Sequence, residues 1–125
     1  MYEMRLDPER RRLYTRLWGF WEQSTYDAYA KDAAKFLTQL GKLPAPTTSL
    51  IDASSSTVQS TDMAAKLAES GQTLSHLLPT RSATVVPNML IKLQAQRLAI
   101  PSSSGAEHAI FTSSHEAEAW LDELK

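Results

Sequence analysis

The sequence contains no cysteine, and this absence excludes several kinds of chemistry. Without thiols the chain can form no disulfide, no cysteine-ligated metal site and no thiolate nucleophile. A chain without disulfides fits a reducing compartment. We therefore expect a cytoplasmic protein.

Glycine is also scarce, with four residues that lie far apart at positions 19, 41, 71 and 105. No glycine-rich loop can therefore cradle a phosphate in the Rossmann or P-loop manner. The histidines, His76, His108 and His115, show none of the spacings of zinc hydrolases. No G-x-S-x-G motif supports a catalytic serine. The sequence thus predicts no enzyme, no cofactor and no metal site.

Long apolar runs and an excess of one charge are absent as well. No run approaches the roughly 18 residues that span a bilayer, and the first residues lack the basic-then-apolar order of a signal peptide. With 13 basic and 14 acidic residues the net charge is −1, which argues against a nucleic-acid binder. The 125 residues, 42% hydrophobic, predict a single domain over 1–125.

An antiparallel hairpin is expected at the start of the chain. Residues 2–6 and 13–18 alternate with the period of strands, and Asp7-Pro8-Glu9-Arg10 between them has turn chemistry. In the second strand one face carries Leu13, Thr15 and Leu17, and the other carries Arg12, Tyr14, Arg16 and Trp18. We interpret the basic residues Arg10, Arg11, Arg12 and Arg16 as a solvated cluster.

Helical and strand patterns alternate through the rest of the chain. Ser24 with Asp27, and Ser113 with Glu116, are candidate capping pairs, and Asn88 is a candidate cap. Helices are predicted over 24–40, 60–78, 88–98 and 113–124, and strands over 50–51, 83–86 and 107–112. The order β-β-α-β-α-β-α-β-α predicts an α/β domain with a mainly parallel mixed sheet, to which the hairpin adds one antiparallel strand.

The stretch 48–62, TSLIDASSSTVQSTD, is the first candidate for a functional site. Leu50 and Ile51 predict a short strand that ends at Asp52, and hydroxyl side chains dominate the loop expected after it. Ligands gather at the carboxyl ends of strands in open α/β sheets. The alternative is a solvated loop with a helix cap. The candidate partner-docking and phosphorylation residues are Asp52, Ser54, Ser55, Ser56, Ser60, Thr61 and Asp62.

Aromatic residues cluster after the hairpin, at Trp18, Phe20 and Trp21. We expect at least one of them in the core, whereas an outward Trp18 beside Tyr14 would form an exposed apolar patch typical of interfaces. An edge strand in the hairpin also favours a homodimer. The candidate residues for an interface or an apolar ligand are Tyr14, Trp18, Trp21, Tyr26 and Tyr29.

Three segments carry a resemblance to a known family: Gly19-Phe20-Trp21 before the first helix, residues 50–54, and residues 109–121 with their strand and final helix. With this element order the chain resembles the SpoIIAA-like group of STAS-type proteins, which are mostly small bacterial proteins, and more loosely CRAL-TRIO lipid-transfer domains. Anti-sigma-factor antagonists of the STAS class carry a phosphorylated Asp-Ser-Ser-Gly-type motif. The comparable residues here are Ser60-Thr61-Asp62, without the preceding aspartate and the glycine.

The resemblance and the residues together predict a non-enzymatic regulatory or protein-interaction module that docks a partner near residues 54–62. One alternative is a carrier of a small apolar ligand or lipid, with a pocket lined by Tyr26, Tyr29 and Leu67. A weaker alternative is a hydrolase that uses Asp52 with a nearby serine. The expected partners are a protein or a second copy of the chain, with no nucleic acid and no membrane span.

Overall fold

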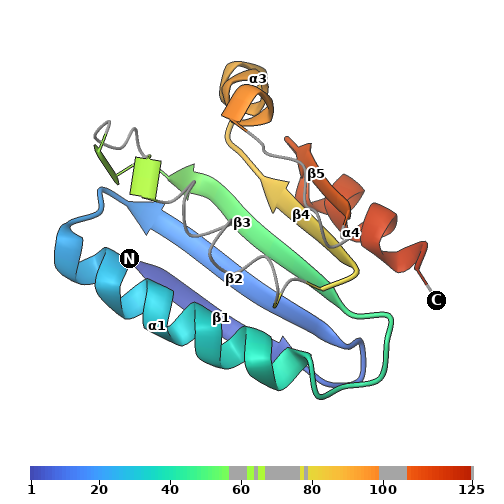
Figure 1. Ribbon diagram of the computed structural model, residues 1–125. Helices are drawn as coiled ribbons and strands as arrows, with labels where there is room; N and C mark the ends of the chain where they lie inside the picture. Colours follow the sequence, from blue (N-terminus) through green and yellow to red (C-terminus); the bar gives the residue numbers. More distant parts are fainter. Residues whose placement is uncertain (57–61, 64, 67–76, 78, 99–106, 125) are drawn as a thin grey trace.

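The computed structural model describes residues 1–56, 62–63, 65–66, 77, 79–98 and 107–124. It confirms the predicted α/β class (Figure 1). The strands are β1 (Tyr2–Asp7), β2 (Arg12–Gly19), β3 (Thr48–Ser56), β4 (Arg81–Val85) and β5 (Glu107–Phe111). The helices are α1 (Gln23–Leu40), α3 (Met89–Leu98) and α4 (Ser114–Asp122).

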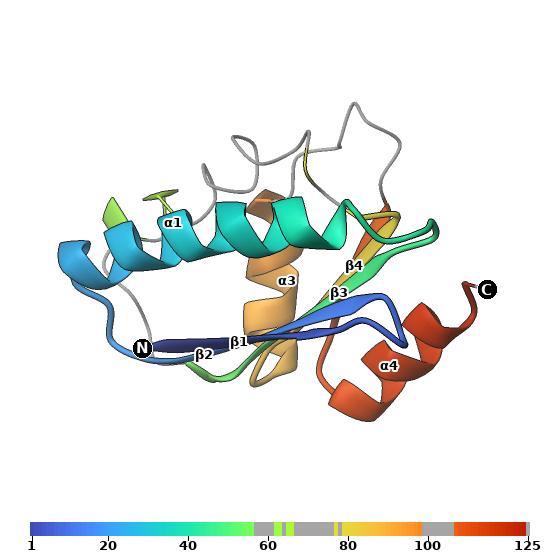
Figure 2. The ribbon, with the colours of Figure 1, turned by 90° about the horizontal axis from the view of Figure 1, so that it is seen from below.

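The five strands form one mixed sheet in the order β1-β2-β3-β4-β5. β1 runs antiparallel to β2, as the hairpin pattern predicted, and β2 to β5 are parallel to one another. Parallel neighbours need a crossover connection, which α1 supplies between β2 and β3 and α3 supplies between β4 and β5. Figure 2 shows α1 and α4 on opposite faces of the sheet.

The core under α1 joins the helix to the hairpin. Leu13 of β2 is buried against Leu37 and Leu40 of α1, whose spacing places them on one side of the helix. The helix begins at Gln23, with Glu22 as its N-cap and no side-chain cap. The predicted Ser24 cap is therefore wrong, because Ser24 already lies in the first helical turn.

The core under α4 joins the last helix to the middle of the sheet. Its buried residues are Leu50, Ala83, Val85, Ala117 and Leu121. The predicted cap of this helix is confirmed, since the Ser113 side chain accepts the Glu116 N–H. The predicted Asn88 cap of α3 is confirmed too, because its side-chain oxygen accepts the Ile91 N–H at 2.9 Å.

Arg12 corrects the interpretation of the basic residues as a solvated cluster, because its side chain is only 3% exposed. Its Nη2 donates to Asp122 Oδ1 at 2.7 Å, and its Nε donates to Thr48 Oγ1 at 2.9 Å. The neighbouring Tyr14 hydroxyl donates to Glu118 Oε1 at 2.9 Å. These contacts attach α4 to β2 and β3, so Arg12 is part of the structure beneath the helix.

Arg81 attaches the other side of α4. Its Nη1 donates to the Trp120 carbonyl at 2.9 Å, which satisfies one of the free carbonyls at the helix end. It also pairs with Glu107 at 3.1 Å and Glu123 at 3.3 Å, and its guanidinium lies 4.6 Å from the centre of the Trp120 ring.

β3 is longer than the sequence predicted. It does not end at Asp52 but continues to Ser56, because β2 extends beside it past a register irregularity, with Trp18 opposite Ser55 and Gly19 opposite Ser56. The assignment of Ser54, Ser55 and Ser56 to a loop is therefore wrong. Most of the helix predicted over 60–78 lies outside the described residues, although 62–63 and 65–66 are helical.

Candidate functional site

The carboxyl ends of β2 to β5 meet at one edge of the sheet because these strands are parallel. α1, α3 and α4 each follow one of these strands, so their amino ends also lie at this edge (Figure 1). Ligands and partners of open α/β sheets bind most often at such an edge. We call it the carboxyl edge.

Only some residues of the predicted serine site can be placed at the carboxyl edge. Asp52 Oδ1 accepts hydrogen bonds from the backbone N–H of Ser54 at 3.0 Å and from its hydroxyl at 2.5 Å. Ser54 and Ser55 are exposed at the end of β3, and Asp62 is exposed in a helical segment. Ser60 and Thr61 lie outside the described residues, so their place in a phosphorylation site stays a prediction. Asp52 thus acts as a local acceptor for the strand end.

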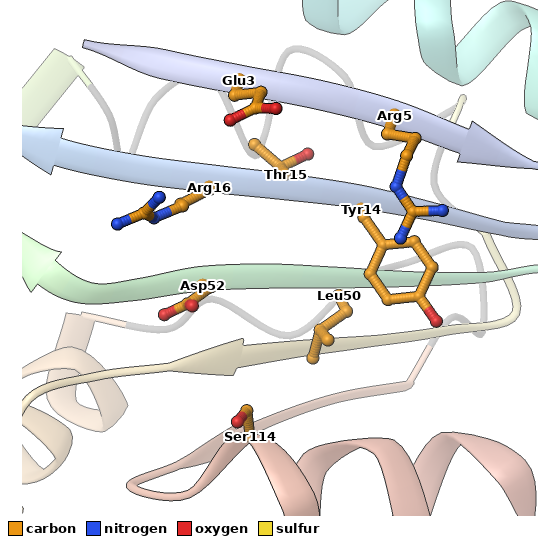
Figure 3. Close-up of a pocket in the computed structure, with 8 residues that line it drawn as sticks. All are labelled: Glu3, Arg5, Tyr14, Thr15, Arg16, Leu50, Asp52 and Ser114. Carbon is orange, nitrogen blue, oxygen red and sulfur yellow. The ribbon is translucent and has the colours of Figure 1, made fainter.

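An open pocket of about 220 Å³ lies on the face of the sheet that α4 covers (Figure 3). Tyr14, Arg16 and Asp52 contribute to it from the residues that the sequence singled out. Figure 3 shows Ser114, at the start of α4, facing Leu50 and Asp52 across the pocket. The full lining is Glu3, Arg5, Tyr14, Thr15, Arg16, Leu50, Asp52 and Ser114.

Two arginines of this pocket are stacked on aromatic rings. The guanidinium of Arg5 lies 4.5 Å from the centre of the Tyr14 ring, and that of Arg16 lies 5.2 Å from the centre of the Trp18 ring. Within the described residues neither guanidinium forms an ion pair or a hydrogen bond, in contrast to Arg12. Stacking holds a guanidinium in place while its N–H groups stay available for a carboxylate or phosphate.

Carboxylates flank these arginines in the register of the sheet. Glu3 on β1 and Asp52 on β3 are the cross-strand neighbours of Arg16 on β2. The pocket therefore presents both signs of charge over a floor formed by Leu50 and Tyr14. Sequence analysis missed Glu3 and Arg5, although the alternation of the first strand places them on the same face as Tyr14 once the hairpin register is known.

Of the aromatic residues proposed for an apolar ligand, Trp21 and Tyr29 pack against each other. Trp21 is 2% exposed, and its ring centre lies 5.1 Å from that of Tyr29 and 6.1 Å from that of Tyr2. Burial, followed by the neighbouring Tyr26, raises the pKa of the Tyr29 hydroxyl to about 12. The Tyr26 hydroxyl donates to the Lys66 carbonyl at 3.2 Å. Of the aromatic run, Trp21 is thus the core residue, while Leu67 lies outside the described residues.

Large apolar side chains are exposed on or beyond the carboxyl edge. Phe20 follows β2 directly and is 61% exposed, and Leu90, near the start of α3, is 66% exposed. Figure 1 shows α3 standing beyond the end of β4. The exposed large apolar residues of the described chain are Met1, Phe20, Met89, Leu90 and Leu93. The sequence predicted a helix over 88–98 without indicating that Leu90 and Leu93 are exposed on it.

The residues considered for hydrolysis or metal binding have the following partners in the described part of the chain. His108 is hydrogen bonded to Thr84 Oγ1 at 3.0 Å, and Ser54 donates its hydroxyl to Asp52. Among the described residues no three His, Cys, Asp or Glu side chains are placed to hold a metal ion. In the same residues, no helix combines the length and apolar character needed to cross a bilayer.

Comparison with known proteins gives one informative match. No family model matches the chain, and no curated protein matches it either. The fold is similar to the crystal structure of an uncharacterized protein of the DUF3478 family with a SpoIIAA-like fold from Shewanella loihica PV-4, with a TM-score of 0.69 and 15% sequence identity. The match covers 96% of this chain and 93% of the other. The chain therefore has the SpoIIAA-like fold that the resemblance implied.

Proposed function

We propose that the protein is a non-enzymatic regulatory module that docks a protein partner on its carboxyl edge. The observation that carries this proposal is the location of the exposed large apolar side chains: Met1, Phe20, Met89, Leu90 and Leu93 all lie on or beyond that edge. Exposed apolar side chains that gather in one region mark interaction sites more often than scattered ones do.

The surroundings of these side chains have the composition of an interface. Protein interfaces combine an apolar centre, enriched in aromatic residues, methionine and arginine, with a polar rim. Phe20 and Met89 supply the apolar part, while Arg16 and the exposed Ser54 and Ser55 supply polar groups beside it. A shallow pocket of about 240 Å³, lined by Met1, Tyr2, Ser24 and Thr25, offers a place for an anchoring side chain of the partner.

The SpoIIAA-like fold supports the same proposal only at the level of architecture. Phosphorylation of a hydroxyl at this edge would add negative charge close to Asp52, which already accepts two hydrogen bonds from Ser54. Repulsion between the two anions would change the docking surface, which is how such a modification would regulate binding.

The test is site-specific photo-crosslinking in the organism's own cells. A benzophenone amino acid is placed at Leu90, on the proposed surface, and at Gln39, an exposed position near the opposite end of α1. We expect a discrete protein adduct from position 90 that is absent from position 39. The purified partner should then bind Leu90→Asp at least about tenfold more weakly than wild type and Gln39→Asp equally well.

The outcomes separate the alternatives. Equal adducts from both positions, or equal affinities of both aspartate variants, would contradict a docking surface at the carboxyl edge. An adduct composed of two copies of this chain would assign the edge to self-association. A lipid-sized adduct would instead favour the carrier predicted as an alternative from the sequence.

A further inference from the structure

Among the described residues, β1 is an edge strand with no strand on its outer side. The strand order ends at β1, and its principal contacts with the described elements are to β2 and α1. Natural proteins usually protect such an edge with proline, a bulge or repelling charges. The segment Tyr2–Asp7, YEMRLD, contains no proline and pairs with β2 without a register shift. Its outer side is therefore a regular template for another strand.

The hydrogen bonds to β2 show which backbone groups of β1 point outward. Met1 and Trp18 exchange both of their backbone hydrogen bonds, each at 3.0 Å. Hydrogen-bonded and non-hydrogen-bonded pairs alternate along an antiparallel ladder. Glu3 and Arg5 therefore direct their backbone groups toward β2, and those of Tyr2, Met4 and Leu6 point to the open side.

We propose that β1 pairs with β1 of a second copy of this chain, antiparallel and with two-fold symmetry centred on Met4. In this register Met4 lies opposite Met4 of the second copy, and Tyr2 lies opposite Leu6 of the second copy. The backbone groups that point to the open side in each copy can therefore hydrogen bond to one another. Glu3 lies opposite Arg5 of the second copy, and this pair occurs twice by symmetry. Both pairs occupy non-hydrogen-bonded positions, where side chains on opposite strands come closest.

The charges select this register against its neighbours. A symmetric pairing centred on Glu3 would keep the backbone hydrogen bonds but place Glu3 opposite Glu3. A pairing centred on Arg5 would place Arg5 opposite Arg5 and Glu3 opposite Asp7. Like charges directly opposite one another destabilise a strand pair. If the two-fold axis fell between two residues, each residue with outward backbone groups would lie opposite a residue whose backbone groups point toward β2. The hydrogen bonds between the two copies of β1 could then not form.

The helix that packs on β1 bears on the arrangement of the second copy. α1 contacts both β1 and β2, and Figure 2 shows it on one face of the sheet, above these strands. A continuous sheet through β1 of both copies would place the two α1 helices on the same face of that sheet.

The dimer would also extend the pocket described above. Glu3 and Arg5 of β1 line that pocket, on the same face of the sheet as α4 (Figure 3). Arg5 of the second copy, opposite Glu3, would form a further wall. The inference stands apart from the proposed docking of a protein partner, because it concerns the side of β1 and not the exposed apolar residues.

Charge-reversal substitutions at Glu3 and Arg5 test the pairing of the two β1 strands. Sedimentation equilibrium of the purified protein should show a reversible dimer, and Arg5→Glu should raise its dissociation constant at least about tenfold by opposing two pairs of glutamates. The double variant Glu3→Arg with Arg5→Glu restores opposite charges and should return the constant to within about threefold of wild type. Arg10→Glu, in the hairpin turn beyond the paired segment, is the matched control and should have no effect.

Single cysteines test the register, since the chain has no native thiol. Residues opposite one another in a non-hydrogen-bonded pair lie about 4.5 Å apart at Cα, within the range of a disulfide. Under mild oxidation Glu3→Cys mixed with Arg5→Cys should form a linked heterodimer, while each variant alone should not link. Links in Glu3→Cys alone or Arg5→Cys alone would overturn the register. A monomeric wild type, or a double charge variant no better than the single one, would overturn the proposal.

Discussion

Replacing Asp122 by alanine should lower the free energy of unfolding by about 2 kcal/mol, although the aspartate side chain is 58% exposed. An exposed ion pair usually contributes about 0–1 kcal/mol. Here the partner, Arg12, is 3% exposed, and the substitution would leave a buried cation. It would keep the hydrogen bond to Thr48 Oγ1 at 2.9 Å and the ion pair with Glu118 Oε1 at 3.7 Å, while its Nη1 already has no hydrogen-bond partner. The exposure of Asp122 keeps the loss below the roughly 3–5 kcal/mol of a fully buried pair.

A second substitution isolates the cause. Arg12→Met replaces the buried cation with an apolar chain of similar length. In that background Asp122→Ala should cost less than about 0.5 kcal/mol, because no buried charge remains to be compensated. The difference between the two backgrounds is the coupling energy, which we expect to be about 1.5 kcal/mol.

Urea unfolding followed by tryptophan fluorescence and circular dichroism measures each free energy. Glu9→Ala, which removes a carboxylate from the hairpin turn, serves as the control and should stay within about 0.5 kcal/mol of wild type. An Asp122→Ala cost that is the same with Arg12 and with methionine at position 12 would refute the reasoning.

Further predictions address the core, the exposed helix and the buried tyrosine. Trp21→Ala should cost about 3–5 kcal/mol in urea unfolding, because the ring is buried against two others; a loss below 1 kcal/mol would contradict this packing. Leu121→Ala, at a fully buried position of α4, should cost about 2–5 kcal/mol, whereas Leu90→Ala on α3 should stay within about 0.5 kcal/mol. Because the pKa of Tyr29 is raised to about 12, the folded protein holds this proton longer than the unfolded chain does, and stability should fall as the pH rises from about 10 to about 12. Tyr29→Phe should remove that part of the pH dependence, and ultraviolet titration of the tyrosines would show whether the late ionisation disappears with it.

Features that depend on neighbouring residues in the sequence could be predicted from the sequence. The hairpin, the faces of its second strand and the Ser113 cap all follow from spacings of two to four residues. The Ser24 cap failed because the helix begins one residue earlier, at Gln23, and such boundaries are decided by small differences in local energy.

Features that depend on distant partners could not be predicted in the same way. Serine has no strong tendency to form strands, and Ser54 to Ser56 belong to β3 because β2 extends far enough to pair with them. Arg12 is buried because α4 brings Asp122 to it. The pocket unites Glu3 of β1, Asp52 of β3 and Ser114 of α4, and their meeting requires the strand order to be known.

The attachment of α4 has a consequence for the order of events during synthesis. Arg12 and Asp122, which form one of its hydrogen bonds, are 110 positions apart. The hairpin and α1 can associate as soon as the first part of the chain has been made, because their contacts are local. The opposite face of the sheet has to wait, with its apolar residues and Arg12 in water, until α4 has been made. A ribosome that stalls before α4 would thus present a nascent chain with an open apolar sheet face, the state most exposed to aggregation and to chaperones.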